Sequence, residues 1–143
     1  MENRIYKFRG KAYKLNNAWV YGSLIQDTEN NVSDIDWFDY SGQHSFEVIP
    51  ESIGQFTGLT DRNGKEIFEG DIVHVIYDDG RDLMGVDADY MDYVYFDSDC
   101  AGFMIHREHG SDTLEHDMGK SIEIVGNRFE NPSLLSQSQP ESK

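Results

Sequence analysis

Three histidines that follow the single cysteine of the chain have side chains that could bind a metal ion. His106, His109 and His116 come after Cys100, and imidazole and thiolate groups are the usual ligands of zinc. The spacing of His106 and His109 would bring two imidazoles to one side of a turn or helix. This spacing matches no closed zinc pattern, however, and one cysteine cannot complete one. We therefore predict neither a metal ion nor a cofactor, and a metal-dependent enzyme that uses residues 106–116 is the weakest of our alternatives.

Aspartates between residues 87 and 92 faintly resemble the start of a calcium-binding loop. An EF-hand loop needs acidic residues at alternating positions, a glycine in its middle and a glutamate at its twelfth position. Asp87 and Asp89 alternate, but the glycine is missing and Asp92 is out of phase with them. The sequence therefore predicts no calcium site.

The motifs of the common enzyme classes are absent from the sequence. It contains no Gly-x-Ser-x-Gly segment, no Walker A segment and no dinucleotide-binding glycine pattern. His74 lies inside an apolar segment, where a hydrogen-bonded structural histidine is more common than a catalytic one. We expect that the chain is not an enzyme, and we assign no catalytic residue.

Tyrosines and aspartates are interleaved around residue 93. Aromatic side chains among basic residues are typical of nucleic-acid surfaces. Aromatic side chains among acidic residues favour instead a protein partner, or mimicry of nucleic-acid charge. The alternative is a core strand whose aspartates are solvated. The candidate partner-binding residues are Asp87, Asp89, Asp92, Tyr93 and Tyr95.

The chain is strongly acidic, and its charges are unevenly distributed. Its 143 residues include 27 acids and 12 bases, which gives a net charge of −15. Such a surface repels nucleic-acid phosphates and anionic lipids. The excess of acids either serves solubility or forms a surface that engages a basic partner. A nucleic-acid-binding barrel stays as the alternative, because residues 1–14 are mostly basic. The charged residues of segment 78–99 are nearly all acidic, and pairing of these two segments between copies would give a homo-oligomer.

No feature of the sequence indicates export or membrane insertion. The first residues are charged and polar, without the apolar stretch of a signal peptide. No apolar run approaches the roughly 18 residues that suggest a membrane span. The single cysteine cannot form an internal disulfide, which is usual for a reducing compartment. We predict a soluble, cytoplasmic protein.

Short strand-like segments must position these side chains. The segment Asp71–Asp78 is apolar on both faces, which indicates a strand buried on both sides. Residues 61–64, Asp-Arg-Asn-Gly, predict a tight hairpin turn, because Asn-Gly readily adopts positive φ angles. Helix is scarce, with single turns expected at Pro50–Gly54 and Asp112–Met118 and a helix start near Asn131. The predicted strands are Ala18–Ile25, Asp34–Tyr40, Ser45–Ile49, Asp71–Asp78, Tyr93–Asp97, Gly102–Arg107 and Ser121–Val125.

A run of glycines and turn residues between residues 48 and 73 is the most specific pattern in the chain. Its two pieces are Ile53–Leu59 (Ile-Gly-Gln-Phe-Thr-Gly-Leu) and Asp61–Val73 (Asp-Arg-Asn-Gly-Lys-Glu-Ile-Phe-Glu-Gly-Asp-Ile-Val). In these pieces the chain resembles the YopX family, small proteins encoded by phages and prophages of bacteria. The similarity continues in Tyr6–Arg9, Trp19–Leu24 and Ile122–Pro132, whereas residues 78–118 depart most from the family.

The resemblance implies a fold, an origin and self-association, but it assigns no functional residue. It implies an SH3-like barrel in the C-terminal half, entered at Glu69-Gly70-Asp71, and a phage or prophage protein in the bacterial cytoplasm. With the strand pattern, this gives a mainly β protein with little helix. We expect an N-terminal antiparallel hairpin region at residues 1–49, an SH3-like small β-barrel with its crossing segment at 50–132, and a disordered tail at 133–143. The expected function is that of a non-enzymatic accessory protein that binds a host or phage protein.

Overall fold

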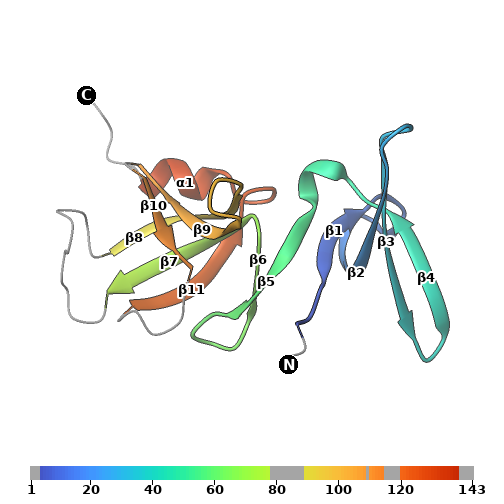
Figure 1. Ribbon diagram of the computed structural model, residues 1–143, viewed down its shortest axis with the longest axis horizontal. Coiled ribbons are helices and arrows are strands. Elements are labelled where there is room, and N and C mark those ends of the chain that lie inside the picture. Colours follow the sequence, from blue (N-terminus) through green and yellow to red (C-terminus); the bar gives the residue numbers. More distant parts are fainter. Residues whose placement is uncertain (1–3, 78–88, 109, 115–119, 139–143) are drawn as a thin grey trace. The chain divides into compact units, whose positions relative to one another are not determined.

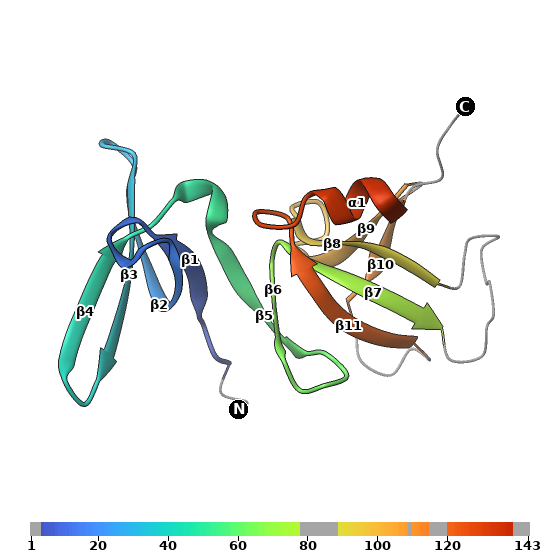
Figure 2. The ribbon, with the colours of Figure 1, turned by 180° about the vertical axis from the view of Figure 1, so that it is seen from behind.

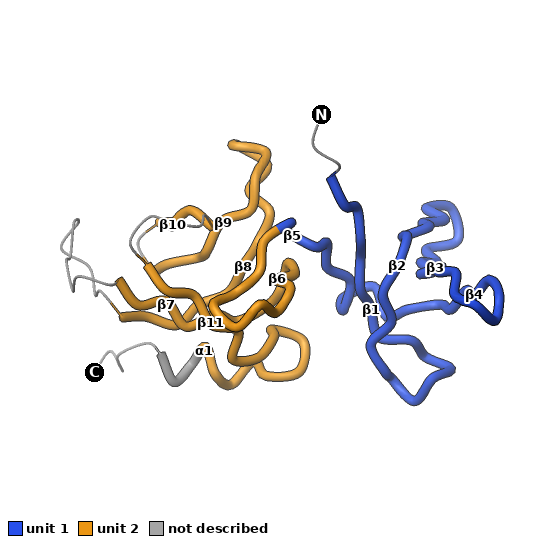
Figure 3. The backbone as a smooth tube through the Cα atoms, turned by 90° about the horizontal axis from the view of Figure 1, so that it is seen from below, with its two compact units in different colours: residues 1–58 blue, residues 59–143 orange. Residues whose placement is uncertain are grey.

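The computed structural model describes residues 4–77, 89–108, 110–114 and 120–138 (Figure 1). The chain divides into two compact units, unit 1 at residues 1–58 and unit 2 at residues 59–143 (Figure 3). Each unit is built almost entirely from antiparallel strands and has a hydrophobic core of its own. The mainly β fold predicted from the sequence is therefore confirmed.

Unit 1 contains an antiparallel sheet in which the strands follow the order β4-β3-β2-β1-β5. The predicted strands at residues 18–25, 34–40 and 45–49 are confirmed, with ends that differ by a few residues, and the turn predicted from Pro50 is the short helix η2. The elements are β1 Phe8–Ala12, η1 Tyr13–Leu15, β2 Ala18–Asp27, β3 Val32–Asp39, β4 Gly42–Glu47, η2 Pro50–Ser52 and β5 Gly54–Thr60, whose last two residues belong to unit 2.

The core of unit 1 is filled from one face of this sheet. Val20 of β2 and Ile35 of β3 are buried together with Val48, and the alternate residues of β2, such as Tyr21 and Ile25, are exposed. A Cβ atom at Gly22 would lie 2.1 Å from the carbonyl oxygen of Asp36. The close approach of β2 and β3 therefore requires glycine at position 22.

Unit 2 contains a sheet in the order β10-β9-β8-β7-β11, and Figure 2 shows β11 beside β7. Helix α1 packs next to β8. The elements are β6 Glu66–Phe68, β7 Asp71–Tyr77, β8 Asp89–Asp97, β9 Gly102–Arg107, β10 Gly110–Thr113, β11 Lys120–Asn127 and α1 Ser133–Ser138.

Strand β7 forms the centre of the core of unit 2. Ile72, Val73 and Val75 have no exposed surface, which confirms the prediction of a strand buried on both faces. Val73 and Val75 pack with Val94 of β8 and Ile105 of β9. The apolar run thus fixes the middle of the sheet around which the other strands assemble.

The predicted hairpin turn at residues 61–64 is confirmed, and the buried side chain of Asp61 holds it. Its Oδ1 accepts hydrogen bonds from the backbone N–H groups of Asn63 (2.9 Å) and Lys65 (3.0 Å). Its Oδ2 accepts a third from the backbone N–H of Ile124 in β11 (3.0 Å). Gly64 has a φ of 81°, as the turn requires. One carboxylate therefore both closes the turn and attaches it to β11.

Several predicted details differ from the structure or stay untested. Asp112 and Thr113 belong to strand β10 instead of a helix, because they pair with β9, and residues 115–118 lie outside the described residues. Helix α1 at Ser133–Ser138 agrees with the helix start predicted near Asn131 and occupies the first residues of the expected disordered tail. The described strands form open sheets, so the SH3-like barrel stays a prediction. No helix in the described ranges is long and apolar enough to cross a membrane.

Candidate functional site

Two tyrosines of β8, a histidine of β9 and an arginine after β11 form an aromatic cluster on unit 2. This Tyr93 cluster consists of Tyr93, Tyr95, His106 and Arg128. The ring of Tyr93 stacks on the imidazole of His106, with centroids 4.6 Å apart and an interplanar angle of 9°. The guanidinium carbon of Arg128 lies 3.8 Å from the centroid of the Tyr93 ring. The imidazole and the guanidinium would collide if both lay on the same face of the Tyr93 ring at these distances. The ring therefore lies between them.

Strand geometry explains how the cluster forms. Tyr93 and Tyr95 are two residues apart in β8 and therefore point to the same face. Val94 is paired with Ile105 of β9, so the adjacent residues Tyr93 and His106 are neighbours across the two strands. Tyr95 meets Tyr93 and His106 edge-on, at 6.0 Å and 6.3 Å between ring centroids. Its hydroxyl hydrogen-bonds with Ser111 of β10, so the cluster spans three adjacent strands.

The structure brings three of the five predicted partner-binding residues together. Asp92 joins Tyr93 and Tyr95, because its Oδ2 lies 3.1 Å from Nδ1 of His106 and its Oδ1 accepts a hydrogen bond from the Tyr93 backbone N–H (2.9 Å). Asp89 instead lies 2.5 Å from Nε2 of His74. Asp87 lies outside the described residues.

The residues considered for metal binding have other contacts or lie outside the described residues. His106 contacts Asp92 and Tyr93, and Cys100 is exposed. His109 and His116 belong to the residues that are not described. Within the described ranges, no three histidine, cysteine or carboxylate side chains come together in a way that could hold a metal ion.

A second polar cluster, the Asp112 network, joins the ends of four strands of unit 2. The hydroxyls of Tyr77 in β7 and Tyr90 in β8 donate hydrogen bonds to Oδ2 of Asp112 in β10, at 2.5 Å and 2.6 Å. The ammonium group of Lys120 in β11 lies 3.1 Å from Oδ1 of Asp112 and also donates to the carbonyl oxygen of Thr113. The Lys120 side chain is 1% exposed and that of Asp112 is 15% exposed, so this ion pair is shielded from water.

The charge states in the Asp112 network follow from burial and hydrogen bonding. Burial, and then the hydrogen bond to Asp112, raise the pKa of Tyr77 to about 12, and the same two causes raise the pKa of Tyr90 well above its ordinary value. Burial opposes the charge of Asp112, but the hydrogen bonds from both tyrosines and the charge of Lys120 outweigh it and lower its pKa. The tyrosines are therefore neutral and Asp112 is charged at neutral pH, which suits a stabilising network better than proton transfer. Sequence reasoning missed it, because its members lie in four different strands.

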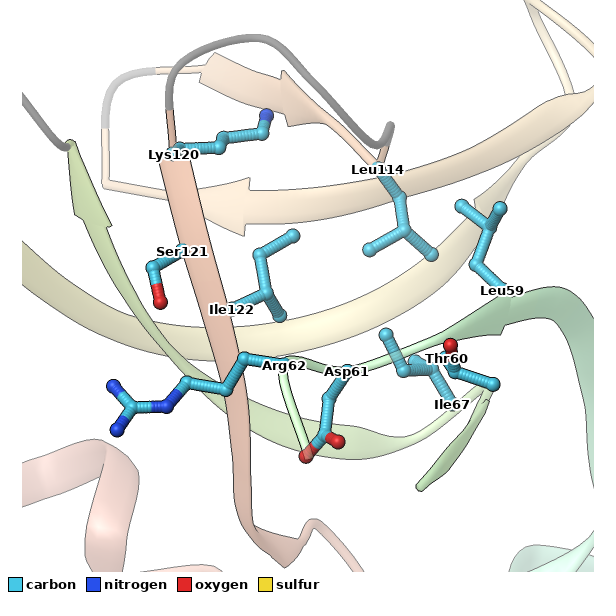
Figure 4. Close-up of a pocket in the computed structure, with 9 residues that line it drawn as sticks. All are labelled: Leu59, Thr60, Asp61, Arg62, Ile67, Leu114, Lys120, Ser121 and Ile122. Atoms are coloured by element: carbon cyan, nitrogen blue, oxygen red, sulfur yellow. The ribbon is translucent and has the colours of Figure 1, made fainter. Parts of the chain in front are cut away.

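A small pocket of about 90 Å³ opens in unit 2 near the turn at residues 61–64 (Figure 4). Leu59, Ile67, Leu114 and Ile122 form its apolar wall. Asp61, the one carboxylate among its described lining residues, accepts hydrogen bonds from backbone N–H groups. Pockets for typical ligands have volumes of roughly 300–1,000 Å³. We therefore assign no ligand to this pocket, and the Tyr93 cluster stands as the candidate site.

Comparison with known proteins gives one family and a similar solved fold. The family model described as YopX protein matches residues 7–136, nearly the whole chain. The crystal structure of protein EF1440 from Enterococcus faecalis is similar to this structure, with a TM-score of 0.51 and 22% sequence identity. The similarity covers 93% of this chain and 99% of that one, and it concerns the fold alone. No curated protein matches the chain.

Proposed function

The chain belongs to the YopX family, and we propose that it is a non-enzymatic module that binds a basic segment of a partner protein through the Tyr93 cluster. The observation that carries this proposal is the Tyr93 ring, held between His106 and Arg128. Tyrosine is enriched among the residues that dominate binding between proteins. A side chain that is ordered before binding also loses less entropy when the partner arrives.

The charge of unit 2 supports a basic partner. Residues 59–143 contain 19 aspartates and glutamates but only seven lysines and arginines. Such an excess of negative charge accelerates the approach of a basic surface and disfavours acidic ones. Next to the cluster, the carboxylate of Asp92 lies 3.1 Å from the imidazole of His106.

The family resemblance supports the finer parts of the proposal. We propose that the protein is encoded by a phage or prophage, acts in the bacterial cytoplasm and binds a host or phage protein. An SH3-like small barrel in unit 2 would be a suitable scaffold, since such folds carry many unrelated binding functions. The non-enzymatic role is supported by the mutual hydrogen bonding of the Asp112 network and by the small volume of the pocket.

Recovery of partners from cells tests the proposal. Tagged wild-type protein and a Tyr95→Ala variant are used to capture proteins from phage-infected bacteria, followed by mass spectrometry. We expect a protein that is enriched by the wild type and lost with Tyr95→Ala. Tyr13→Ala serves as the matched control, because it removes a half-exposed tyrosine from unit 1 and should retain the partner. The proposal would be contradicted if no protein were recovered above background, or if the wild type and Tyr95→Ala recovered the same amount of it.

Binding of single-stranded nucleic acid is the second candidate, and one observation in unit 1 favours it. The ammonium of Lys11 lies 5.0 Å from the ring of Trp19, and the guanidinium of Arg9, a buried residue, lies 4.6 Å from the same ring. Cations beside an aromatic ring are typical of surfaces that bind single strands. The net charge of −15 opposes this binding, so it should be weak and sensitive to salt. A gel-shift assay at low salt that shows no complex would eliminate it.

A further inference from the structure

We propose that Arg128 occupies the place of a partner's arginine on the Tyr93 ring, and that a guanidinium group of the partner displaces it on binding. Arg128 would then be a built-in competitor that restrains binding. This inference rests on the proposed partner-binding role of the Tyr93 cluster, and it adds the chemical group that is recognised.

Among the residues that the structure describes, the ring of Tyr93 is the one group in contact with the guanidinium of Arg128. Its guanidinium carbon is 3.8 Å from the ring centroid of Tyr93. Among the described residues, this guanidinium forms neither an ion pair nor a side-chain hydrogen bond, although unit 2 is rich in carboxylates. Arg128 is exposed, and a cation–aromatic contact at an exposed site is weak. A second cation can therefore replace it without breaking an ion pair.

The backbone of Arg128, in contrast, is firmly positioned next to Tyr93. The backbone N–H of Gly70 donates to the carbonyl oxygen of Val94 (2.8 Å), and the carbonyl oxygen of Gly70 accepts from the Arg128 N–H (2.8 Å). Gly70 has a φ of 94°, which favours glycine. The turn before β7 thus connects the strand that carries Tyr93 to the segment that carries Arg128.

The turn that carries Arg128 is also closed on itself. The side chain of Asn127 accepts a hydrogen bond from the Glu130 backbone N–H (2.8 Å), and the backbone N–H of Asn131 donates to the carbonyl oxygen of Asn127 (2.8 Å). Displacement therefore needs only rotation of the Arg128 side chain, while the turn stays in place.

The groups left behind by Arg128 suit a guanidinium group of another protein. The freed face of Tyr93 offers a flat aromatic surface on which a planar guanidinium can stack. His106 supports the opposite face, where Asp92 lies 3.1 Å from its imidazole. Lysine lacks the planar geometry, so an arginine side chain is the better match.

Binding of a defined peptide tests the competition. The probe is a capped Gly-Arg-Gly-Arg-Gly peptide, titrated into full-length protein by calorimetry, with the corresponding lysine peptide for comparison. Arg128→Ala should bind the arginine peptide roughly 2- to 5-fold more tightly than the wild type, because the competing contact is lost. The lysine peptide should bind more weakly, and its affinity should increase less when Arg128 is replaced by alanine.

Arg62→Ala is the matched control for charge. It removes one exposed arginine from the same unit, where Arg62 lies 3.9 Å from Glu123. Each substitution removes one positive charge, so the general attraction between the acidic protein and the basic peptide increases equally in both variants. If Arg128→Ala binds the arginine peptide more tightly than Arg62→Ala does, the difference is due to the loss of the competing contact. Equal affinities of the two variants would overturn the inference. Thermal unfolding of each variant verifies that it is folded.

A spectroscopic measurement follows displacement in the wild type. The Cδ protons of Arg128 should show an upfield ring-current shift from Tyr93 and move towards the values of an unstructured arginine as the arginine peptide is added. Unchanged signals at saturation would overturn the inference. If neither the wild type nor Arg128→Ala binds the peptide, the inference also fails, while recovery of a cellular partner that depends on Tyr95 would still support the proposed function.

Discussion

Aspartates of unit 1 bind residues that are close to them in the sequence, whereas two aspartates of unit 2 also bind residues that are far away in the sequence. In unit 1, Oδ1 of Asp39 accepts hydrogen bonds from the backbone N–H (2.8 Å) and hydroxyl (2.5 Å) of Ser41, two residues away. In unit 2, Asp61 binds the backbone of Ile124, 63 residues away, and Asp112 binds Tyr77, 35 residues away. Carboxylates therefore shape individual hairpins in unit 1, including the turn at Asp27, whereas Asp61 and Asp112 hold distant strands together in unit 2.

This difference shows that the acidic residues of the chain have more than one structural role. Residues 1–58 contain eight acids and five bases, compared with 19 acids and seven bases in residues 59–143. Part of the larger excess in unit 2 is used internally, in the turn at Asp61 and in the Asp112 network. From the net charge alone, one would expect all of these carboxylates to lie on the surface. Substitutions in the two units can test the distinction.

The largest expected effect follows substitution of Asp112. Asp112→Ala leaves the buried ammonium group of Lys120 without its counter-charge, and the loss of one partner of a buried ion pair costs roughly 3–5 kcal/mol. We expect this decrease in the free energy of unfolding, measured by urea denaturation. The double variant Asp112→Asn, Lys120→Met should be more stable than Asp112→Ala, because no unpaired buried charge remains. A loss below 1 kcal/mol in Asp112→Ala would contradict a long-range stabilising role.

Substitution of Asp61 should have the next largest effect. Asp61→Ala removes the acceptor of three backbone N–H groups, one of them in β11. We expect a decrease of roughly 2–3 kcal/mol in the free energy of unfolding, because these donors lose a charged partner. Asp61→Asn retains one acceptor oxygen and should lose less. In hydrogen exchange, Ile124 should lose protection together with Lys65, and retention at Ile124 would show that the contact between turn and strand is not stabilising.

The tyrosines of the Asp112 network should titrate late on addition of base. Burial, together with the hydrogen bond to Asp112, raises the pKa of Tyr77 to about 12. Because the folded-state pKa is above the ordinary value of 10.0, this group stabilises the fold fully below pH 10 and loses that effect as the pH rises through 12. Ultraviolet absorbance of tyrosinate, compared between wild type and Tyr77→Phe, should show a difference only near pH 12. A difference centred at pH 10 would mean that Tyr77 is solvated.

The smallest effect is expected for Asp39 in unit 1. The Ser41 hydroxyl, followed by His44, lowers the pKa of Asp39 to about 2 from 3.8. A lowered folded-state pKa means that the contribution to stability is present above pH 3.8 and is lost as the pH falls through 2. The wild type should therefore lose slightly more stability than Asp39→Asn between neutral pH and pH 2, measured by urea denaturation of both proteins. An effect of Asp39→Asn at neutral pH as large as that of Asp112→Ala would remove the contrast between the units.

Most of the strands could be predicted because their signals are local. The apolar run of β7 and the Asn63-Gly64 turn depend on residues that are adjacent in the sequence, and both are confirmed. The helix expected from Asp112 is wrong at its start, because pairing with β9 overrides the local capping pattern. Local signals cannot report which strand will be available for pairing.

The candidate site could be predicted only in part. Tyr93, Tyr95 and Asp92 were identified from the interleaving of aromatic and acidic residues. Sequence reasoning considered His106 only as a metal ligand and missed Arg128, because their contacts with Tyr93 depend on strand register and on the turn at Gly70. Glycine at position 70 was a usable signal for a turn, but it does not state which segments the turn connects.

The sequence by itself determined the acidic charge, the mainly β fold, the principal turns and the resemblance to a family. These properties depend on composition and on short-range preferences, which are present before the chain folds. Only the tertiary structure decided which carboxylates are internal and which groups cover the two faces of Tyr93. Such contacts join residues far apart in the chain, and they arise when packing of the core fixes the register of the strands.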